Sequence, residues 1–310
     1  MKKLFALILA LALALSLAAC GGNSNNTAEE QTTEPAAAEE TAPAEDEATA
    51  EDETPAEEEA PAEEPAETVV LKVAASPVPH AEILAQVVDD LAEQGIELVV
   101  TEYTDYVVPN TAVEEGDEDV NYFQHAPYLN QFNEENGTHL VSVAPIHYEP
   151  FGIYPCLTAS LDELQDGALV AVPNDVTNEA RALLLLADNG LITLADGVGL
   201  NATTNDIVEN PKNLQFIEVE AAAVANLTSE VDIAAINGNY ALDAGFSSAA
   251  DAIAIEDPNS EAAQTYANLI VVKEGNENDP AVLALVEALQ SDEVRDYINS
   301  TYEGNVLPIF

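Results

Sequence analysis

The stretch Val172–Leu186, "VPNDVTNEARALLLL", joins the end of a short apolar run to an apolar helical pattern. We predict a buried strand over Ala168–Asp175, followed at once by a helix that carries Arg181. Asp175 or Thr177 can cap the start of this helix, because their side-chain oxygens can accept hydrogen bonds from free backbone N–H groups. A strand that turns directly into a helix is the repeating unit of α/β proteins.

Similar units recur through the rest of the chain. Short apolar runs, which predict strands, alternate with amphipathic patterns, which predict helices. The other predicted strands include Leu71–Ser76, Ile96–Tyr103, Leu214–Glu220, Val231–Tyr240 and Asn268–Gly275, and the predicted helices include His80–Glu93, Ala281–Gln290 and Ser291–Tyr302. We therefore predict an α/β fold with mostly parallel sheets, in which ligands bind outside the carboxyl ends of the strands.

The amino end predicts an exported lipoprotein. Lys2 and Lys3 precede an apolar run that is shorter than the roughly 18–20 residues needed to span a bilayer. The run ends in "LAAC", which matches the bacterial lipobox and is typical of a signal peptide that ends in small residues. We predict a signal peptide over residues 1–20 with Cys20 lipidated. The alternative is an ordinary secreted protein that has a cysteine near its cleavage site.

An acidic segment separates the signal peptide from the folded part. Residues 28–67 are rich in Glu, Ala, Pro and Thr and contain no basic or aromatic residue. Such a composition cannot bury enough apolar surface to offset its conformational entropy, so we predict a disordered linker over residues 21–68. The whole chain has 7 Lys+Arg against 58 Asp+Glu. This excess of acid argues against nucleic acid as a partner, because binding phosphates requires a basic surface.

The sequence contains few residues suited to covalent or metal chemistry. With Cys20 lipidated, Cys156 has no partner for an intrachain disulfide, and we expect it to be a buried structural thiol. The four histidines lack a close metal-ligand spacing, and the motifs G-x-S-x-G, G-x-x-x-x-G-K-[ST] and H-E-x-x-H do not occur. We therefore expect no catalytic residues, metal or cofactor, and a protein that is not an enzyme.

Arg181 is one of only two arginines in the chain. Asn178 precedes it by three positions, so both side chains project from one face of the first helical turns. The positive end of the helix dipole lies on the same side. Arg181 is therefore either the anchor for an anionic group of a ligand or one partner of an internal salt bridge to one of the many acids. The helix alone leaves both interpretations open.

Aromatic residues make up only 5% of the sequence but concentrate in one part of it. The segment "FQHAPY" is predicted to lie at a strand-to-helix turn, because Pro127 suits the first position of a helix. Phe132 and Tyr148 are assigned to core packing. The cluster also contains Tyr103, Tyr106, Tyr122, Phe123, Tyr128, Phe151 and Tyr154, with His125 and His147. Of these, the aromatic residues and the histidine of "FQHAPY", Phe123, Tyr128 and His125, are expected to line a pocket.

Eight stretches together carry a resemblance to one family. They occur in the family's order and are Ser76–Leu84 "SPVPHAEIL", Tyr103–Asn110 "YTDYVVPN", Phe123–Leu129 "FQHAPYL", His147–Tyr154 "HYEPFGIY", Leu164–Asp175 "LQDGALVAVPND", Thr177–Leu186 "TNEARALLLL", Asp206–Leu214 "DIVENPKNL" and Ile236–Ala241 "INGNYA". The chain resembles the NlpA/MetQ family, the methionine-binding lipoproteins of bacterial ABC importers. The resemblance covers essentially everything after the linker.

The resemblance implies a particular fold. It is the two-lobe, periplasmic-binding-protein-like fold of type 2, in which each lobe is a mostly parallel sheet flanked by helices and two hinge crossovers join the lobes. Carried over to this sequence, the first lobe is expected at residues 69–149 and 239–310, and the second lobe at residues 150–238. Such lobes close around a ligand by a hinge motion.

The resemblance also implies a set of ligand-binding residues. Arg181 is expected to hold the ligand's carboxylate through its planar fork, and Asn178 and Asn237 to bind its polar end. Aromatic rings are expected to enclose the thioether, at about 0.3–1.5 kcal/mol per contact. The expected set is Tyr106, Phe123, His125, Tyr128, Asn178, Arg181 and Asn237. Asn205 is a weaker candidate, and His80 either faces the cleft or caps its helix.

The function implied is that of a substrate-binding lipoprotein. It would capture methionine, most simply L-methionine, and deliver it to an ABC permease and its ATPase from the outer face of the bacterial cytoplasmic membrane, anchored by lipid. D-methionine, methionine sulfoxide and a methionyl dipeptide are alternative ligands. A sensor or surface adhesin of the same fold is the alternative from another class.

Overall fold

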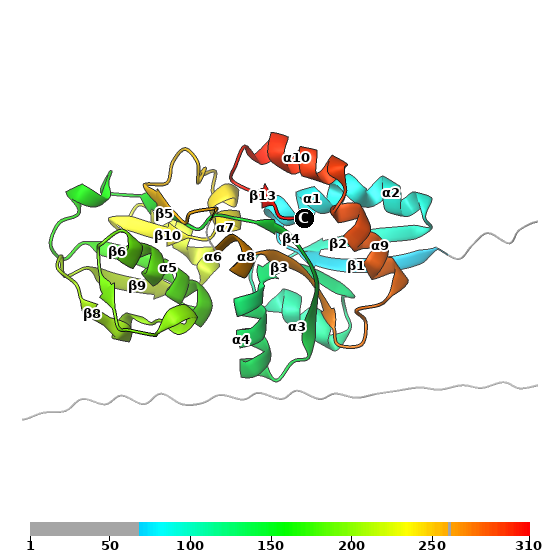
Figure 1. Ribbon diagram of the computed structural model, residues 1–310, viewed down its shortest axis with the longest axis horizontal. Coiled ribbons are helices and arrows are strands. Elements are labelled where there is room, and N and C mark those ends of the chain that lie inside the picture. Colours follow the sequence, from blue (N-terminus) through cyan, green and yellow to red (C-terminus); the bar gives the residue numbers. More distant parts are fainter. Residues whose placement is uncertain (1–67, 260–261) are drawn as a thin grey trace, which may run out of the picture. The chain divides into compact units, whose positions relative to one another are not determined.

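The computed structural model describes residues 68–259 and 262–310, so the predicted signal peptide, Cys20 and nearly all of the predicted linker lie outside the described residues. The described residues belong to one compact unit. Two larger sheets, one in each of two lobes, organise this unit (Figure 1). Within the described ranges, no helix has the length and apolar character needed to cross a membrane.

The first lobe is built on a six-stranded sheet with the strand order β13-β4-β12-β3-β1-β2. Its strands are β1 (Val69–Ala75), β2 (Ile96–Glu102), β3 (Val120–His125), β4 (Leu140–Tyr148), β12 (Asn268–Lys273) and β13 (Leu307–Pro308). β1 pairs in parallel with β2 and β3, whereas β12 runs antiparallel to both β3 and β4. All residues of β3 are buried, which fits its central place in the sheet.

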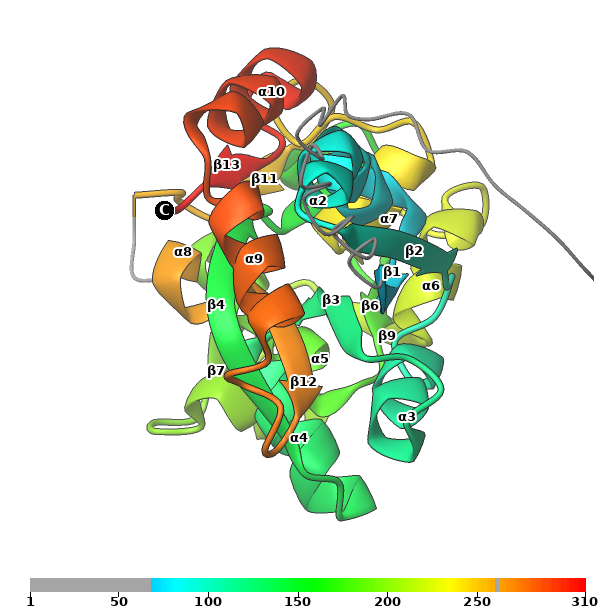
Figure 2. The same cartoon turned by 90° about the vertical axis from the view of Figure 1, so that its right-hand side faces the viewer.

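Helices cover both faces of the first sheet (Figure 2). One face packs against α1 (Glu82–Leu84), α2 (Val88–Glu93), α9 (Pro280–Leu289) and α10 (Asp292–Tyr302). The other face packs against α3 (Val108–Glu115) and α4 (Ala126–Asn136), where Phe132 lies in the core as predicted. The helix expected over His80–Glu93 is interrupted, because helical turns at Pro77–Ala81 and Ala85–Val87 flank α1.

The second lobe is built on a five-stranded sheet with the strand order β11-β5-β10-β6-β9. Its strands are β5 (Gly152–Pro155), β6 (Leu169–Pro173), β9 (Gln215–Val219), β10 (Ile233–Ile236) and β11 (Ala254–Ile255), and β7 (Thr193–Leu194) with β8 (Ile207–Glu209) forms a separate pair. β6 pairs in parallel with β9 and β10, whereas β5 runs antiparallel to β10 and β11.

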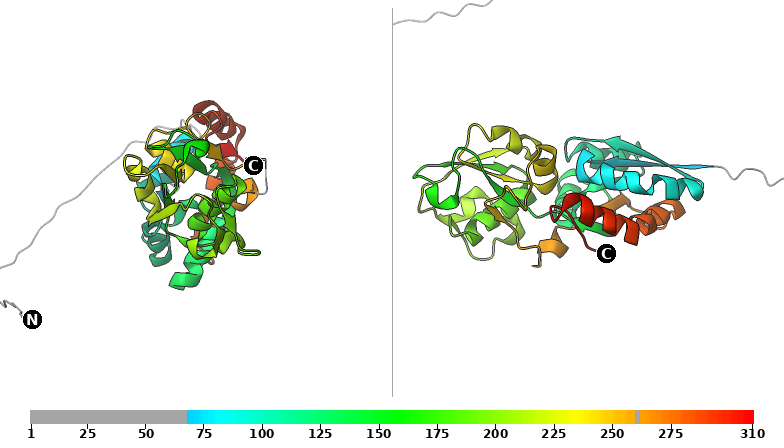
Figure 3. Two further views of the ribbon diagram at one scale, coloured as in Figure 1. Left: turned by 90° about the vertical axis from the view of Figure 1, so that its left-hand side faces the viewer. Right: turned by 90° about the horizontal axis from the view of Figure 1, so that it is seen from above.

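Helices also cover both faces of the second sheet. α5 (Val176–Asp188) packs its leucines, among them Leu183 and Leu186, into the core on one face. α6 (Ala221–Val224) and α7 (Gly238–Asp243) pack on the other face. Short 3-10 turns occur at Leu161–Glu163, Gly199–Asn201, Thr204–Asp206 and Ala225–Leu227, and α8 (Ala262–Thr265) belongs to the segment that returns to the first lobe (Figure 3).

The α/β class, the two lobes and the two crossovers agree with the prediction, but two details were wrong. Three of the five pairings in the first sheet and two of the four in the second are antiparallel, so the sheets are mixed. The return to the first lobe also comes later than residue 239, because β11 still pairs with β5 in the second lobe. Both errors arise from return strands, whose direction and partners the local sequence pattern does not reveal.

Strand ends from both lobes come together where the lobes meet. β3 ends at His125, β6 leads directly into α5, and β10 ends just before Asn237. The register of β12 places Asn268 opposite His125 of β3 on one side and opposite His147 of β4 on the other. The fold therefore gathers polar side chains from distant parts of the sequence at the junction of the lobes.

Candidate ligand-binding site

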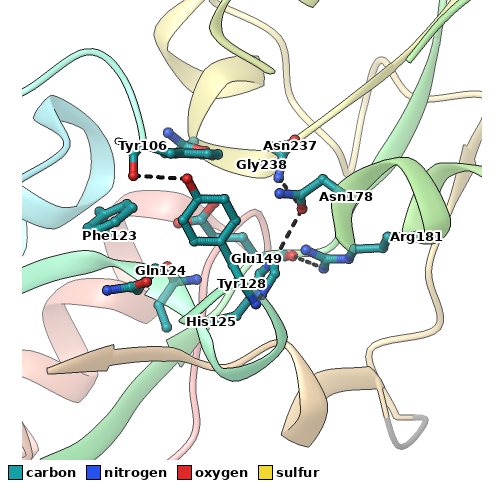
Figure 4. Close-up of a pocket in the computed structure, with 12 residues that line it drawn as sticks. Tyr106, Phe123, Gln124, His125, Tyr128, Glu149, Asn178, Arg181, Asn237 and Gly238 are labelled. Atoms are coloured by element: carbon teal, nitrogen blue, oxygen red, sulfur yellow. Dashed lines mark hydrogen bonds between the residues drawn. The ribbon is translucent and has the colours of Figure 1, made fainter. Parts of the chain in front are cut away.

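A cavity lies between the two lobes, and residues from both form its wall (Figure 4). In the conformation described, the free space within it is small, about 20 Å³. The lining residues are Tyr106, Phe123, Gln124, His125, Tyr128, Glu149, Asn178, Arg181, Asn237, Gly238, Asn239 and Asn268. All seven residues predicted for the site are among them. Hydrogen bonds cross between the lobes here, from Tyr106 Oη to Asn239 Oδ1 (2.5 Å) and between His125 Nε2 and Asn178 Oδ1 (3.1 Å).

The start of α5 places Arg181 and Asn178 on the cavity. The carboxylate of Asp175 caps the helix by accepting a hydrogen bond from Asn178 N (3.0 Å), so Asp175 and not Thr177 is the cap. Arg181, on the next turn, is only 4% exposed. Burying a guanidinium is costly unless its charge and its N–H groups find partners.

Arg181 has such a partner inside the protein. Its Nε donates to Oε1 of Glu256 (2.6 Å) and its Nη2 donates to Oε2 of Glu256 (2.5 Å) and to the backbone oxygen of Glu149 (3.0 Å). Burial alone would lower the pKa of Arg181, but the adjacent Glu256 carboxylate outweighs burial and raises it, so the side chain stays charged. The internal salt bridge considered for Arg181 is therefore present.

The salt bridge does not use all the donors of Arg181. A guanidinium has five N–H groups, and the three hydrogen bonds above use Nε and Nη2. Nη1 donates to no residue that the structure describes, and Arg181 lines the cavity. The plane of the guanidinium is held by aromatic rings, since Cζ lies 4.1 Å from the centroid of Tyr266 and 5.1 Å from that of Phe151. Arg181 can thus serve as a salt-bridge partner and offer a fixed edge to an anion at once.

A chain of hydrogen bonds fixes three further predicted residues. His125 Nδ1 accepts from the backbone N–H of Tyr128 (3.2 Å), so the ring proton lies on Nε2 and is donated to Asn178 Oδ1. Asn237 Nδ2 donates to the same oxygen (2.8 Å). Burial, together with the positive charge of Arg181, lowers the pKa of His125 to about 3, so the ring is neutral near neutral pH.

Asn237 keeps one unused acceptor. Its side-chain oxygen Oδ1 is buried and has no hydrogen-bond partner among the described residues, although Asn237 is only 5% exposed. An unpaired buried acceptor costs free energy, roughly 1–3 kcal/mol. Because Asn237 lines the cavity, a donor on a bound ligand would remove this cost.

Aromatic rings form the opposite part of the wall. The ring of Tyr106 lies 5.6 Å from Phe123 and 5.7 Å from Tyr128, measured between centroids. Tyr106 also lies 4.9 Å from Tyr240 of the second lobe, so it contacts aromatic residues of both lobes. This group gives the cavity an apolar end beside the polar end formed by Arg181 and the asparagines.

Beneath the cavity lies a buried cluster that the sequence did not predict. The Tyr122 hydroxyl bonds Nδ1 of His147, which leaves the ring proton of His147 on Nε2 to be donated to Oε1 of Glu149 (2.8 Å). His80 Nε2 bonds Oδ1 of Asn268 (2.9 Å) and lies 3.6 Å from the same oxygen of Glu149. His80 is fully buried, so it neither lines the cavity nor caps a helix as expected.

This cluster contains residue types that bind metals. Ligand atoms of His80, His147 and Glu149 lie within 4.8 Å of one another. His80 and His147, which are far apart in the sequence, are therefore close in space. In both histidines, however, the Nε2 atom already forms a hydrogen bond. His147 Nε2 bonds Glu149, and His80 Nε2 bonds Asn268. In this arrangement the cluster holds the carboxylate of Glu149 in position.

Two other residues considered in the sequence, Asn205 and Cys156, lie away from the cavity lining. Asn205, the weaker candidate, is exposed on the turn Thr204–Asp206 and does not line the cavity, so that prediction was wrong. Cys156 is a half-buried free thiol, and burial raises its pKa to about 11. A thiol with that pKa is protonated near neutral pH and is a weak nucleophile.

Comparisons with known proteins agree with this geometry. The sequence profile of the NlpA lipoprotein family matches residues 71–310. The chain is 44% identical over 229 residues to the D-methionine-binding lipoprotein MetQ of Escherichia coli (strain K12), covering 73% of this chain and 82% of that protein. Among solved structures, a putative lipoprotein of Ruminococcus gnavus is 60% identical with a TM-score of 0.77, covering 78% of this chain and 99% of that one. A nutrient-binding protein of Burkholderia cenocepacia, solved with bound methionine, is 42% identical with a TM-score of 0.73, covering 77% and 100%.

Proposed function

Because the chain belongs to the NlpA lipoprotein family, we propose that it is the substrate-binding lipoprotein of an ABC amino-acid importer. It captures methionine between its two lobes and delivers it to a membrane permease and the associated ATPase. The role is to bind and release, without a chemical step. The methionine-bound relative from Burkholderia cenocepacia, 42% identical, supports methionine as the ligand.

One observation carries the proposal: the cavity has a polar end and an aromatic end. Arg181 keeps Nη1 free at the polar end, where a carboxylate can accept its N–H groups. Tyr106, Phe123 and Tyr128 stand at the other end, where a thioether sulfur can contact ring edges. Methionine carries these two groups on one small molecule.

L-methionine is the ligand that we propose first. The related protein of Escherichia coli carries D-methionine in its name, which supports D-methionine as an alternative ligand. A methionyl dipeptide would need a longer cleft than a single amino acid does, and methionine sulfoxide would place a polar oxygen among the rings.

We also propose a location. Cys20 is lipidated and holds the protein at the outer face of the bacterial cytoplasmic membrane, and the acidic linker separates the folded lobes from that anchor. Metabolic labelling with a fatty-acid analogue, with Cys20→Ala as the control, tests the anchor. A sensor or adhesin would carry the same anchor, so a permease is distinguished by co-purification of the ATPase and permease with the lipidated protein.

The experiment that tests the function is native mass spectrometry of residues 62–310, purified without added ligand. This segment contains every core described above. We expect a bound species with the mass of methionine that is lost on denaturation. If the protein is empty, calorimetric titration with L-methionine, D-methionine, the sulfoxide and methionyl dipeptides decides, and absence of binding to all four would refute the proposal.

A further inference from the structure

Tyr240 is a buried tyrosine of the second lobe that lies next to the cavity without lining it. We propose that Tyr240 is a positioning residue for ligand release: its hydroxyl holds the two lobes together across the cleft and so sets how fast a bound ligand leaves. This inference rests on the proposed function, in which the lobes open and close around the ligand. It assigns Tyr240 no contact with the ligand itself.

The hydroxyl of Tyr240 reaches the first lobe. Tyr240 is the third residue of α7, and its Oη donates a hydrogen bond to the backbone oxygen of Thr104 at 3.2 Å. Thr104 lies in the segment 103–107, which joins β2 to α3 in the first lobe. Burial, together with nearby carboxylates, raises the pKa of Tyr240, so the hydroxyl keeps its proton and remains a donor near neutral pH.

A second hydrogen bond runs in the opposite direction between the same two segments. Tyr106 of the first lobe donates to Oδ1 of Asn239, the residue before Tyr240, at 2.5 Å. The rings of Tyr106 and Tyr240 lie 4.9 Å apart between centroids, with 33° between their planes. Each lobe therefore supplies one tyrosine donor and one acceptor to the other. We call these four residues, Thr104, Tyr106, Asn239 and Tyr240, the clasp.

Each half of the clasp is fixed to its own lobe. In the first lobe, the backbone oxygen of Tyr106 accepts a hydrogen bond from the Tyr128 hydroxyl (3.0 Å), and Asp105 Oδ1 accepts one from the backbone N–H of Val107 (2.7 Å). In the second lobe, Tyr240 packs into the core that covers one face of the sheet. Because each half is held by its own lobe, separation of the lobes has to break the hydrogen bonds of the clasp.

Tyr240 also stands between the cavity and the outer part of the cleft. Two outer hollows, with about 400 Å³ and 200 Å³ of free space, are lined by residues of both lobes, and Tyr240 lines both hollows. The larger hollow shares Tyr106 and Tyr128 with the cavity, and the smaller one shares Asn239. The residues shared between the cavity and the hollows are therefore members of the clasp or, for Tyr128, bonded to it.

The clasp is directly connected to residues that line the cavity. Asn237, Gly238 and Asn239 line the cavity, and Tyr240 follows them in the sequence. Tyr106 lines the cavity and also belongs to the clasp through its hydroxyl. Formation of the clasp therefore brings the start of α7 and the ring of Tyr106 into place around the cavity, although the hydroxyl of Tyr240 bonds only the protein.

The position of the clasp has a kinetic consequence. A ligand enters while the lobes are apart, before the clasp forms, and leaves only after the clasp breaks. The clasp therefore slows dissociation and leaves the association rate unchanged, which is where most differences in affinity between related complexes lie. Because the hydroxyl of Tyr240 bonds the opposite lobe, it slows the release of every ligand by the same factor. A residue that contacts the ligand instead distinguishes one ligand from another.

The test is Tyr240→Phe, which removes the hydroxyl and keeps the ring. Association and dissociation rate constants for L-methionine are measured on residues 62–310 by stopped-flow tyrosine fluorescence, because the chain contains no tryptophan. We expect dissociation to become about 3- to 10-fold faster, the range for one hydrogen bond, and association to change by less than about twofold. An unchanged dissociation rate, or an affinity lost through slower association, overturns the inference and leaves the proposed function standing.

Tyr154→Phe is the matched control. Tyr154 is fully buried in the same core as Tyr240, and its hydroxyl has no hydrogen-bond partner among the described residues. This variant removes the same atom from the same core, and we expect both rate constants to stay at their wild-type values. If Tyr154→Phe releases methionine as fast as Tyr240→Phe does, the effect belongs to core packing and the inference is wrong.

A second ligand separates the clasp from a contact with the ligand. L-norleucine has a methylene group in place of the sulfur of L-methionine. We expect Tyr240→Phe to speed the dissociation of both ligands by the same factor, whereas Phe123→Leu, in the cavity wall, should weaken methionine more than norleucine. Factors that differ more than about twofold in Tyr240→Phe contradict the inference. A wild-type protein that binds neither ligand refutes the proposed function and the inference together.

Discussion

Arg181 and Glu256 form a two-point ion pair, with Nε–Oε1 at 2.6 Å and Nη2–Oε2 at 2.5 Å. Oε2 of Glu256 also accepts from the Tyr148 hydroxyl (2.7 Å) and from the backbone N–H of Phe151 (3.2 Å). Glu256 follows β11 at the second crossover, and Tyr148 and Phe151 flank the first crossover. One carboxylate therefore ties both hinge segments to the side chain that we propose holds the ligand.

The first prediction concerns Glu256→Gln. Removing one charge of a buried pair leaves the other uncompensated, and we expect the free energy of unfolding to fall by about 3–5 kcal/mol. The edge of Arg181 that Glu256 occupied becomes available to the ligand's carboxylate. Saturating methionine should therefore raise the melting temperature of the variant more than that of the wild type. Thermal melts with and without methionine measure this, and an equal rise in both proteins would contradict it.

The second prediction concerns Arg181→Ala. We expect methionine binding to disappear, and the free energy of unfolding to fall by about 3–5 kcal/mol because Glu256 loses its partner. The double variant Arg181→Ala, Glu256→Gln removes both charges and should recover part of the stability but none of the binding. Urea denaturation and calorimetry measure the two effects. Binding that survives in the double variant would show that Arg181 acts only as the partner of Glu256.

The third prediction separates pocket aromatics from core aromatics. Phe123→Leu removes a ring from the cavity wall, and we expect methionine affinity to fall about 2- to 10-fold, the worth of one sulfur–aromatic contact. Phe132→Leu is the matched control, because Phe132 lies in the same core but not on the cavity. It should lower stability and leave affinity unchanged. Equal loss of affinity in both variants would assign the effect to the core.

The fourth prediction concerns stability and pH. Burial lowers the pKa of His80 to about 4 and those of His125 and His147 to about 3, below the value of about 6.5 in the unfolded chain. Groups with lowered pKa stabilise the folded state above the unfolded pKa, and this stability is lost as pH falls through the folded pKa. Glu149, Asp175 and Glu179, whose pKa burial raises, act oppositely.

Each histidine can contribute up to about 1.4 kcal/mol per pH unit in this window. The backbone N–H groups of Asn239, Asn178 and Thr204 hold back protonation of Glu149, Asp175 and Glu179 respectively, so the histidines should dominate between about pH 6.5 and pH 5. We expect the free energy of unfolding, measured in urea, to fall across that range. A wild-type stability that is flat from pH 7 to pH 5 would disprove the assignment of neutral buried histidines.

The sequence predicted the parts of the site that follow from local pattern. Asp175 caps α5, and Asn178 and Arg181 lie on the cavity, because a strand-to-helix turn has a regular geometry. The aromatic segment around Phe123 and Tyr128 lies at such a turn as well. These residues are recognisable because arginines and aromatics are scarce in this chain.

The missed residues depend on long-range packing. Glu149 is one of 58 acidic residues, so its type carried no information. Its place on the cavity follows from contacts with His80, 69 positions earlier in the chain, and with Gly238, 89 positions later. Asn268 reaches the site because β12 pairs with both β3 and β4, and periodicity does not reveal that register. Glu256 was missed for the same reason as Glu149.

The place of β12 also sets an order of assembly. The strands of the second lobe's sheet all lie between residues 152 and 255, in one continuous segment. The first sheet has β12 between β3 and β4, so it remains divided until residues 268–273 have joined it. A chain that emerges amino end first during synthesis therefore holds a complete second lobe while the first is still open. The last stretch to emerge closes the first lobe and brings Asn268 to the site, so a chain cut short before it has neither.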